Sequence, residues 1–107
     1  MNIWKPPGID EEPRTKLTHW QAYLVKGGFG PEGGDTIHFC GWTGWTGRVC
    51  SAVQSYDKES HCGITQSGRI YELSGEPCFN IDALYVWYCW LANANNPETV
   101  NISDQYV

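Results

Sequence analysis

The sequence predicts an α+β fold, in which an antiparallel sheet of four to five strands carries one C-terminal helix packed on a face. Three observations lead to this prediction. Several short segments alternate between apolar and polar residues, glycine-containing turns separate them, and one segment near the C-terminus has helical periodicity. Since 107 residues are enough for one core, we expect a single domain over residues 1–107.

The chain begins with a segment that does not suit a helix. Its first fifteen residues hold three prolines and the acidic run 10–12, so we expect an extended arm over residues 1–15. Residues 16–26 then alternate in polarity and predict the first strand. A glycine-rich loop over 27–35 should lead to a second strand over 36–42, which is rich in β-branched and aromatic residues.

Three further strands are expected in the middle of the chain. Residues 48–56 alternate again, and residues 61–65 and 70–73 follow as short strands with turn residues between them. Because these connections are short, the three strands should form an antiparallel meander.

The turn between the last two of these strands predicts a register. With Ser67 and Gly68 as the two central residues of a hairpin turn, Thr65 faces Ile70, because glycine tolerates the positive φ that such turns require. In this register, residue 62 lies opposite residue 73.

The predicted helix spans residues 81–94. Asn80 is a suitable N-cap, and Pro97 ends the run because proline cannot continue a helix. The inward face should consist of residues at i, i+3, i+4 and i+7 spacing, namely Leu84, Trp87, Tyr88 and Leu91. A short alternating piece at Val100 and Ile102 could add an edge strand.

The other face of this helix is apolar as well. Asp82 is the only charged residue from 81 to 96, and the side away from the inward face holds Tyr85, Val86, Cys89 and Trp90. A helix that is apolar around its circumference is normally buried on two sides, so either the sheet wraps it or another protein covers it. We therefore predict a partner-facing stripe of Tyr85, Cys89 and Trp90. The alternative is that the tryptophans belong to the core.

Two more tryptophans, Trp42 and Trp45, lie three residues apart in the glycine-flanked loop 41–47. Tryptophan is enriched among the residues that dominate binding energy, so both indoles are candidate anchors for a partner. The alternative is that one or both cover the end of the sheet as a plug, because large aromatic residues are often buried.

The charge of the chain bears on the class of partner. Twelve acidic and seven basic residues give a net charge of −5, which opposes direct binding to a phosphate backbone. We expect instead a basic surface on a protein that handles nucleic acid, with acidic residues such as Asp57 and Glu59 steering the encounter. Arg69 could meet a carboxylate of the partner. Alternatively, Arg69 is a solvated strand end paired with Glu59 or Glu72.

The five cysteines are an odd number in a chain without an export signal, so we expect buried free thiols and no disulfide framework. Zinc ligands could come from His38, Cys40, Cys50, His61 and Cys62. Their spacing does not match the close pairs of structural zinc sites, so we predict no metal and no other cofactor. We also expect no enzyme, because no nucleophile, metal or phosphate signature is complete.

No apolar run reaches the about 20 residues needed to cross a bilayer, and the N-terminus has no apolar stretch of signal-peptide length. We therefore expect a cytoplasmic protein with no membrane partner.

One pattern resembles a known group of proteins. It consists of Thr65, Ser67, Gly68, Arg69, Tyr71, Leu73, Gly75 and Pro77, followed by Tyr85, Val86, Trp87 and Trp90. It resembles short accessory proteins of bacterial mobile elements and prophages. The resemblance covers the hairpin and the helix, and it implies a phage-encoded, anti-CRISPR-like inhibitor that binds a host defence complex and blocks nucleic-acid binding or assembly. It implies no catalytic residue. Two alternatives stay open, a zinc-stabilised binding module and a homodimeric accessory protein that uses the stripe of Tyr85, Cys89 and Trp90 for self-association.

Overall fold

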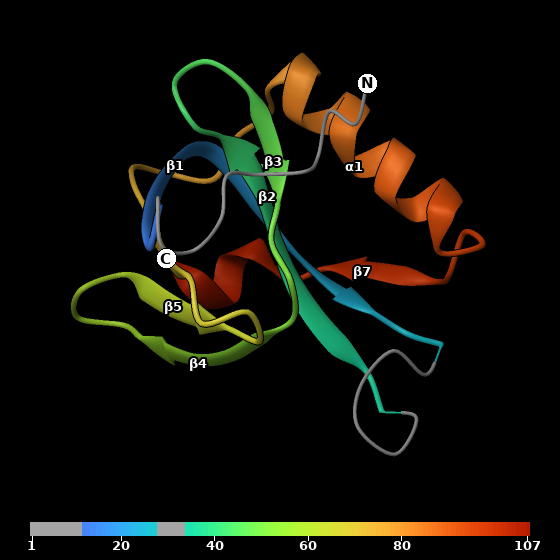
Figure 1. The fold of residues 1–107 in the computed structure, drawn as a ribbon, viewed down its shortest axis with the longest axis horizontal. Coiled ribbons are helices and arrows are strands. Elements are labelled where there is room, and N and C mark those ends of the chain that lie inside the picture. Colours follow the sequence, from blue (N-terminus) through green and yellow to red (C-terminus); the bar gives the residue numbers. More distant parts are fainter. Residues whose placement is uncertain (1–11, 28–33) are drawn as a thin grey trace.

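The computed structural model describes residues 12–27 and 34–107, so most of the predicted arm and most of the predicted glycine-rich loop lie outside the described residues. The described part is α+β, with one α-helix in its C-terminal third, as predicted (Figure 1). In chain order its elements are β1 (Arg14–Val25), β2 (Thr36–Trp42), β3 (Gly47–Val49), β4 (Val53–Asp57), β5 (Cys62–Thr65), β6 (Ile70–Leu73), α1 (Ile81–Asn93), β7 (Thr99–Asn101) and the 3₁₀-helix η2 (Ser103–Tyr106).

The sheet is larger than predicted and is not purely antiparallel. Within the described residues it has seven strands in the order β3-β2-β1-β6-β5-β4, with β7 also paired to β1. The pair β1–β6 is parallel, and all other pairs are antiparallel. The prediction of four to five antiparallel strands is therefore wrong in the number of strands and in this pair. Alternation along each strand shows which residues share a face, but it carries no information on which distant strand lies alongside.

Strand β1 joins the two halves of the sheet. Its first residues pair with β6, whereas its later residues pair with β2 and β7. The change of partner coincides with a break in register between Thr18 and Gln21, and His19 between them has a positive φ of 48°. A bulge of this kind bends a strand and allows it to pass from one packed layer to the next. The bulge therefore lies where β1 passes from the half of the sheet that contains β6 to the half that contains β2 and β7.

Two clusters of buried residues lie on the two faces of β2. The first cluster lies between the halves of the sheet and contains Leu17, Trp20, Ala22, Phe39, Cys50, Tyr71, Leu73 and Tyr106. The second lies beneath the helix and contains Val25, Cys40, Ala83 and Trp87. Phe39 and Cys40 fall in different clusters because successive side chains of a strand point to opposite faces. Figure 1 shows this arrangement, with α1 and the β4–β5 hairpin on opposite sides of β2.

The predicted strand over 48–56 is in fact two strands. Strand β3 stays beside β2, while β4 pairs with β5 in the other half of the sheet. The chain crosses between the halves at Cys50, which is buried and whose backbone N–H donates to the carbonyl of Phe39 over 3.0 Å. Polarity alternates across this crossing, so the sequence pattern does not reveal it. The predicted meander is confirmed for β4, β5 and β6, which are sequential antiparallel neighbours.

The predicted register of the β5–β6 hairpin is wrong by one residue. Ile64 pairs with Ile70, and the N–H of Thr65 donates to the carbonyl of Arg69 over 3.1 Å. The loop therefore has three residues, 66–68, and Gly68 closes it with a φ of 91°. Three-residue hairpin loops commonly end on a glycine with positive φ. Gly68 therefore belongs to the turn, as predicted, but as the third residue of a three-residue loop and not as the second residue of a two-residue loop.

The helix has the predicted boundaries to within one residue. Asn80 is the N-cap, and its Oδ1 accepts a hydrogen bond from the N–H of Ala83 over 3.0 Å. Asn95 and Asn96 both have positive φ, and the N–H of Asn96 donates to the carbonyl of Leu91 over 2.8 Å. This left-handed pair ends the helix before Pro97. The edge strand predicted near Val100 and Ile102 is confirmed as β7.

In the part of the chain that the structure describes, α1 is too short to cross a bilayer, and no other helix is long and apolar enough to do so.

Candidate protein-binding surface

A pocket of about 320 Å³ lies between the β2–β3 loop and the first two turns of α1. We call it the aromatic pocket. Its lining consists of Trp42, Trp45, Thr46, Gly47, Asp82, Tyr85 and Val86. Three of the predicted partner-binding residues, Trp42, Trp45 and Tyr85, therefore meet at one place although about 40 residues separate the loop from the helix.

The loop that carries the tryptophans is held by its own hydrogen bonds. The backbone N–H of Thr43 donates to the carbonyl of Thr46 over 2.9 Å, and the N–H of Thr46 donates back to the Thr43 hydroxyl over 3.3 Å. Gly44 allows this closure because its φ is 109°. Trp45 at the tip is 78% exposed and Trp42 is half-buried, so Trp45 does not act as a plug over the sheet.

The loop rests directly on the start of the helix. A Cβ placed on Gly47 would lie 2.7 Å from the carbonyl oxygen of Asp82 and 2.8 Å from the Cα of Ala83. Only glycine permits this approach of β3 to the backbone of α1. In addition, the Cys40 thiol of β2 donates to the carbonyl of Ala83 over 3.2 Å. These contacts fix the position of the helix relative to the loop, and hence the shape of the aromatic pocket.

The helix presents a different face to the sheet from the predicted one. Its buried residues are Ala83, Val86 and Trp87, whereas Tyr88, predicted to point inward, is 62% exposed. The buried stripe runs one residue earlier along the chain than predicted. A helix that is apolar all round fits several such phases, so spacing alone does not select one. Tyr85 points outward, as predicted, and is 61% exposed.

The other two residues of the predicted stripe differ in their surroundings. Trp90 is half-buried, stacks on Trp87 with ring centroids 5.3 Å apart, and lies 4.6 Å from the His38 ring. Cys89 is also half-buried, and its hydrogen bond with the hydroxyl of Tyr85 raises the pKa of that tyrosine. Trp90 therefore packs on the core beneath the helix, and Cys89 supports Tyr85 from the next turn.

The predicted charged contacts lie elsewhere. Asp57 and Glu59 are exposed in the β4–β5 turn, where the Asp57 carboxylate accepts the N–H of Glu59 over 3.1 Å. Arg69 is only 4% exposed, and its guanidinium lies 3.4 Å from the Glu12 carboxylate. The interpretation of Arg69 as a solvated strand end is therefore wrong, and the buried guanidinium is not exposed to a carboxylate of a partner either. Glu12 also pairs with the buried Arg48 over 2.9 Å, and the acidic run 10–12 was the signal for this contact in the sequence.

The potential zinc ligands do not gather at one point. His38 hydrogen-bonds through Nε2 to the Thr36 hydroxyl over 2.8 Å and through Nδ1 to the carbonyl of Cys50 over 2.9 Å. Across residues 12–27 and 34–107, no group of three or more histidine, cysteine, aspartate or glutamate side chains is placed to hold a metal ion. All five cysteines are free thiols. Cys40 and Cys50 are buried as predicted, but the prediction of buried thiols is wrong for the half-buried Cys62 and Cys89 and for the exposed Cys78.

We expect His38 to make stability depend on pH. Burial lowers the pKa of His38 below its ordinary value of 6.5, although the hydrogen bond to Cys50 opposes the shift. The unfolded chain therefore binds a proton near pH 6.5 that the folded chain does not, and the free energy of unfolding should fall as the pH drops from 7.5 to 5.5. The loss is at most about 1.4 kcal/mol per pH unit.

Urea unfolding of His38→Gln and of the wild type across this pH range tests the expectation. The dependence should be weaker in His38→Gln, and His61→Gln, at an exposed histidine, is the control for the loss of an imidazole. Equal slopes for the wild type and His38→Gln would show that His38 is not the group involved.

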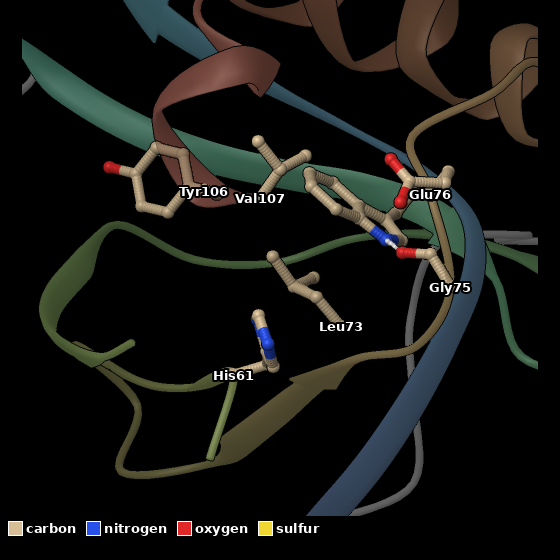
Figure 2. A pocket seen from close by; sticks show the side chains of 7 residues that line it. His61, Leu73, Gly75, Glu76, Tyr106 and Val107 are labelled. Carbon is tan, nitrogen blue, oxygen red and sulfur yellow. Dashed lines mark hydrogen bonds between the residues drawn. The ribbon is translucent and has the colours of Figure 1, made fainter. Parts of the chain in front are cut away.

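A second pocket of about 320 Å³ lies among β1, β6, the β6–α1 connection and the C-terminal end of the chain (Figure 2). Its lining consists of Trp20, His61, Leu73, Gly75, Glu76, Tyr106 and Val107. The buried Trp20 donates its indole N–H to the carbonyl of Gly75 over 3.0 Å, and Figure 2 shows the Tyr106 hydroxyl directed away from Leu73. This pocket contains none of the predicted partner-binding residues, so we take the aromatic pocket as the candidate site.

Asp82 lines the aromatic pocket but was not predicted as a site residue, since the sequence analysis noted it only as the one charged residue of the helical segment. Its position three residues before Tyr85 was the available signal, because residues at i and i+3 are neighbours on a helix surface.

In comparisons with protein-family models, curated proteins and solved structures, nothing matches this chain.

Proposed function

We propose that the protein is a non-catalytic inhibitor that binds another protein through the aromatic pocket. The observation that supports this proposal best is the convergence of Trp42, Trp45 and Tyr85 on one surface pocket, with Trp45 and Tyr85 largely open to solvent. Tryptophan and tyrosine dominate the energetics of protein interfaces, since they bury a large area with few rotatable bonds.

The surface around the aromatic pocket suits such a role. Ile81 and Tyr88 on the helix are exposed and extend the apolar area beyond Tyr85. Contiguous exposed apolar residues of this kind often mark an interaction site. The loop is closed by its own hydrogen bonds and rests on the helix backbone, so little conformational freedom would be lost on binding, which favours affinity.

The class of partner in this proposal is a host nucleic-acid-handling defence complex. The net charge of −5 favours a basic partner surface and would speed the encounter with it. The resemblance of residues 65–90 to phage and mobile-element accessory proteins connects the chain to anti-CRISPR-like inhibitors. By covering a basic surface in the host cytoplasm, such an inhibitor would block nucleic-acid binding or assembly of the complex.

Affinity capture from a host lysate at low salt tests this function. Three baits are compared: the wild type, the double variant Trp45→Ala/Tyr85→Ala, and the control Phe79→Ala, which removes an aromatic side chain that is 67% exposed outside the pocket. We expect the wild type and the control to retain a component of a defence complex and the double variant to lose it. Recovery of no defence component by the wild type would contradict the proposal.

A second candidate function is homodimerisation through the same helix surface. The exposed positions of Ile81, Tyr85 and Tyr88 favour it, because an apolar patch can pair with its own copy about a two-fold axis. Sizing chromatography of the wild type and Tyr88→Glu separates the two functions. A dimeric wild type that becomes monomeric in the variant would favour self-association, whereas a monomeric wild type would exclude it at the concentration used.

A further inference from the structure

We propose that the aromatic pocket binds the guanidinium side chain of an arginine on the partner protein. This inference rests on the proposed function and names the group that would enter the site. Its basis is the composition of the lining, which combines three aromatic residues, Trp42, Trp45 and Tyr85, with the acidic residue Asp82.

The rings provide the attraction for a cation. The faces of tryptophan and tyrosine carry partial negative charge, and a guanidinium within about 6 Å of a ring centroid is drawn to them. Trp45 and Tyr85 are accessible and Trp42 is half-buried, so a side chain that enters from solvent meets aromatic surface. Arginine suits this surface better than lysine because its planar, weakly hydrated group stacks on an indole.

Asp82 supplies the counter-charge. It is exposed, and among the lysines and arginines of residues 12–27 and 34–107 none forms an ion pair with it. The helix N-terminus beside it carries about half a positive charge, which a full carboxylate charge outweighs. Moreover, Asn80 already accepts the N–H groups of Ala83 and Leu84, so these two donors are not available to an anion. The site therefore favours a cation.

The aromatic pocket is large enough to admit one side chain. Its volume of about 320 Å³ lies at the lower end of the roughly 300–1,000 Å³ that small-molecule pockets span. The contact of Gly47 with the backbone of Asp82 and Ala83 holds the acidic and the aromatic walls together before any ligand arrives. An arginine from a basic surface is the cationic group that a chain with a net charge of −5 would meet.

The test uses N-acetyl-arginine amide as the probe and N-acetyl-citrulline amide as its neutral analogue of the same shape. Binding is followed through the indole N–H resonance of Trp45 in NMR spectra of the full chain. We expect the arginine probe to shift this resonance in a saturable manner and the citrulline probe to bind at least roughly threefold more weakly, because it lacks the charge. Equal binding of both probes, or no shift with arginine, would overturn the proposal.

Charge removal at the pocket gives the second arm. Asp82→Asn should weaken binding of the arginine probe roughly two- to fivefold, as expected for an accessible ion pair, and Asp104→Asn should not change it. Both aspartates are exposed, so both variants should fold, which thermal unfolding verifies. Unchanged affinity in Asp82→Asn would overturn the role of this carboxylate.

The two proposals fail in different ways. If Asp82→Asn captures a partner as strongly as the wild type does and the arginine probe does not bind, the proposed protein binding stands and the proposed arginine site is wrong. If the arginine probe binds as expected but no defence component is captured, the site stands and the proposed function is wrong.

Discussion

Replacing Phe39 by alanine should lower the free energy of unfolding by about 3–5 kcal/mol, the usual effect of removing a buried aromatic side chain. Phe39 is fully buried between the two halves of the sheet, and its ring meets Tyr56 and Tyr106 edge-on at centroid distances of 5.9 and 5.3 Å. Strand β5 passes so close that a Cβ on Gly63 would lie 2.8 Å from the ring. Removing the ring leaves a cavity that rigid backbone on both sides prevents from closing.

Urea unfolding of Phe39→Ala measures this loss, and Phe79→Ala is the matched control. The same chemical change at the exposed Phe79 should alter stability by no more than about 0.5 kcal/mol. A loss below about 1.5 kcal/mol in Phe39→Ala would be well short of the effect expected for a core residue. It would mean that the two halves of the sheet do not close on this side chain.

Replacing Trp45 by alanine should weaken binding to the captured partner by about 30-fold or more. Truncation of a central interface tryptophan commonly costs at least 2 kcal/mol, which corresponds to this factor. Because Trp45 is 78% exposed, the same change should leave the free energy of unfolding within about 0.5 kcal/mol of the wild type. The expected result is a large effect on binding that is separate from any effect on stability.

Isothermal titration of the partner with wild type, Trp45→Ala and Phe79→Ala measures this effect. Phe79→Ala removes an aromatic ring of comparable exposure away from the aromatic pocket and should bind like the wild type. Similar affinities for all three proteins would place the interface elsewhere. Equal weakening in both variants would indicate a general response to lost aromatic surface.

Local chemistry predicted the ends of the helix and the neighbours within the meander. Asn80 was recognisable as an N-cap because its side chain satisfies a free N–H, and Pro97 limited the helix for an equally local reason. Short turns likewise made β4, β5 and β6 sequential neighbours. Each of these features depends on residues a few positions apart, so it can be read from the chain directly.

The features that could not be predicted from the sequence depend on contacts between distant segments. The parallel pairing of β1 with β6 joins residues 14–17 to residues 70–73, and no local pattern selects it. The phase of the helix was ambiguous for a similar reason. The helix α1 carries apolar residues around its whole circumference, so its sequence does not select a buried side. The contact of Gly47 with the first turn of α1 fixes which side faces the sheet.

The candidate site was partly predictable. Trp42, Trp45 and Tyr85 were identified as anchors from residue type and surroundings, but their meeting in one pocket follows from the packing of β3 on α1. Asp82 belongs to the same pocket for that reason. The burial of Arg69, which was predicted as an exposed contact, could not be predicted because it depends on Glu12, a residue 57 positions away.

Binding through the aromatic pocket is tested most directly by following the tryptophan side chains while the partner binds. In protein labelled with 5-fluorotryptophan, each indole gives its own ¹⁹F resonance, and that of Trp45 can be assigned from Trp45→Phe. On addition of the captured partner, the Trp45 resonance should shift, whereas the resonances of the buried Trp20 and Trp87 should change little. A complex that forms while the Trp45 resonance stays unchanged would contradict binding through the aromatic pocket.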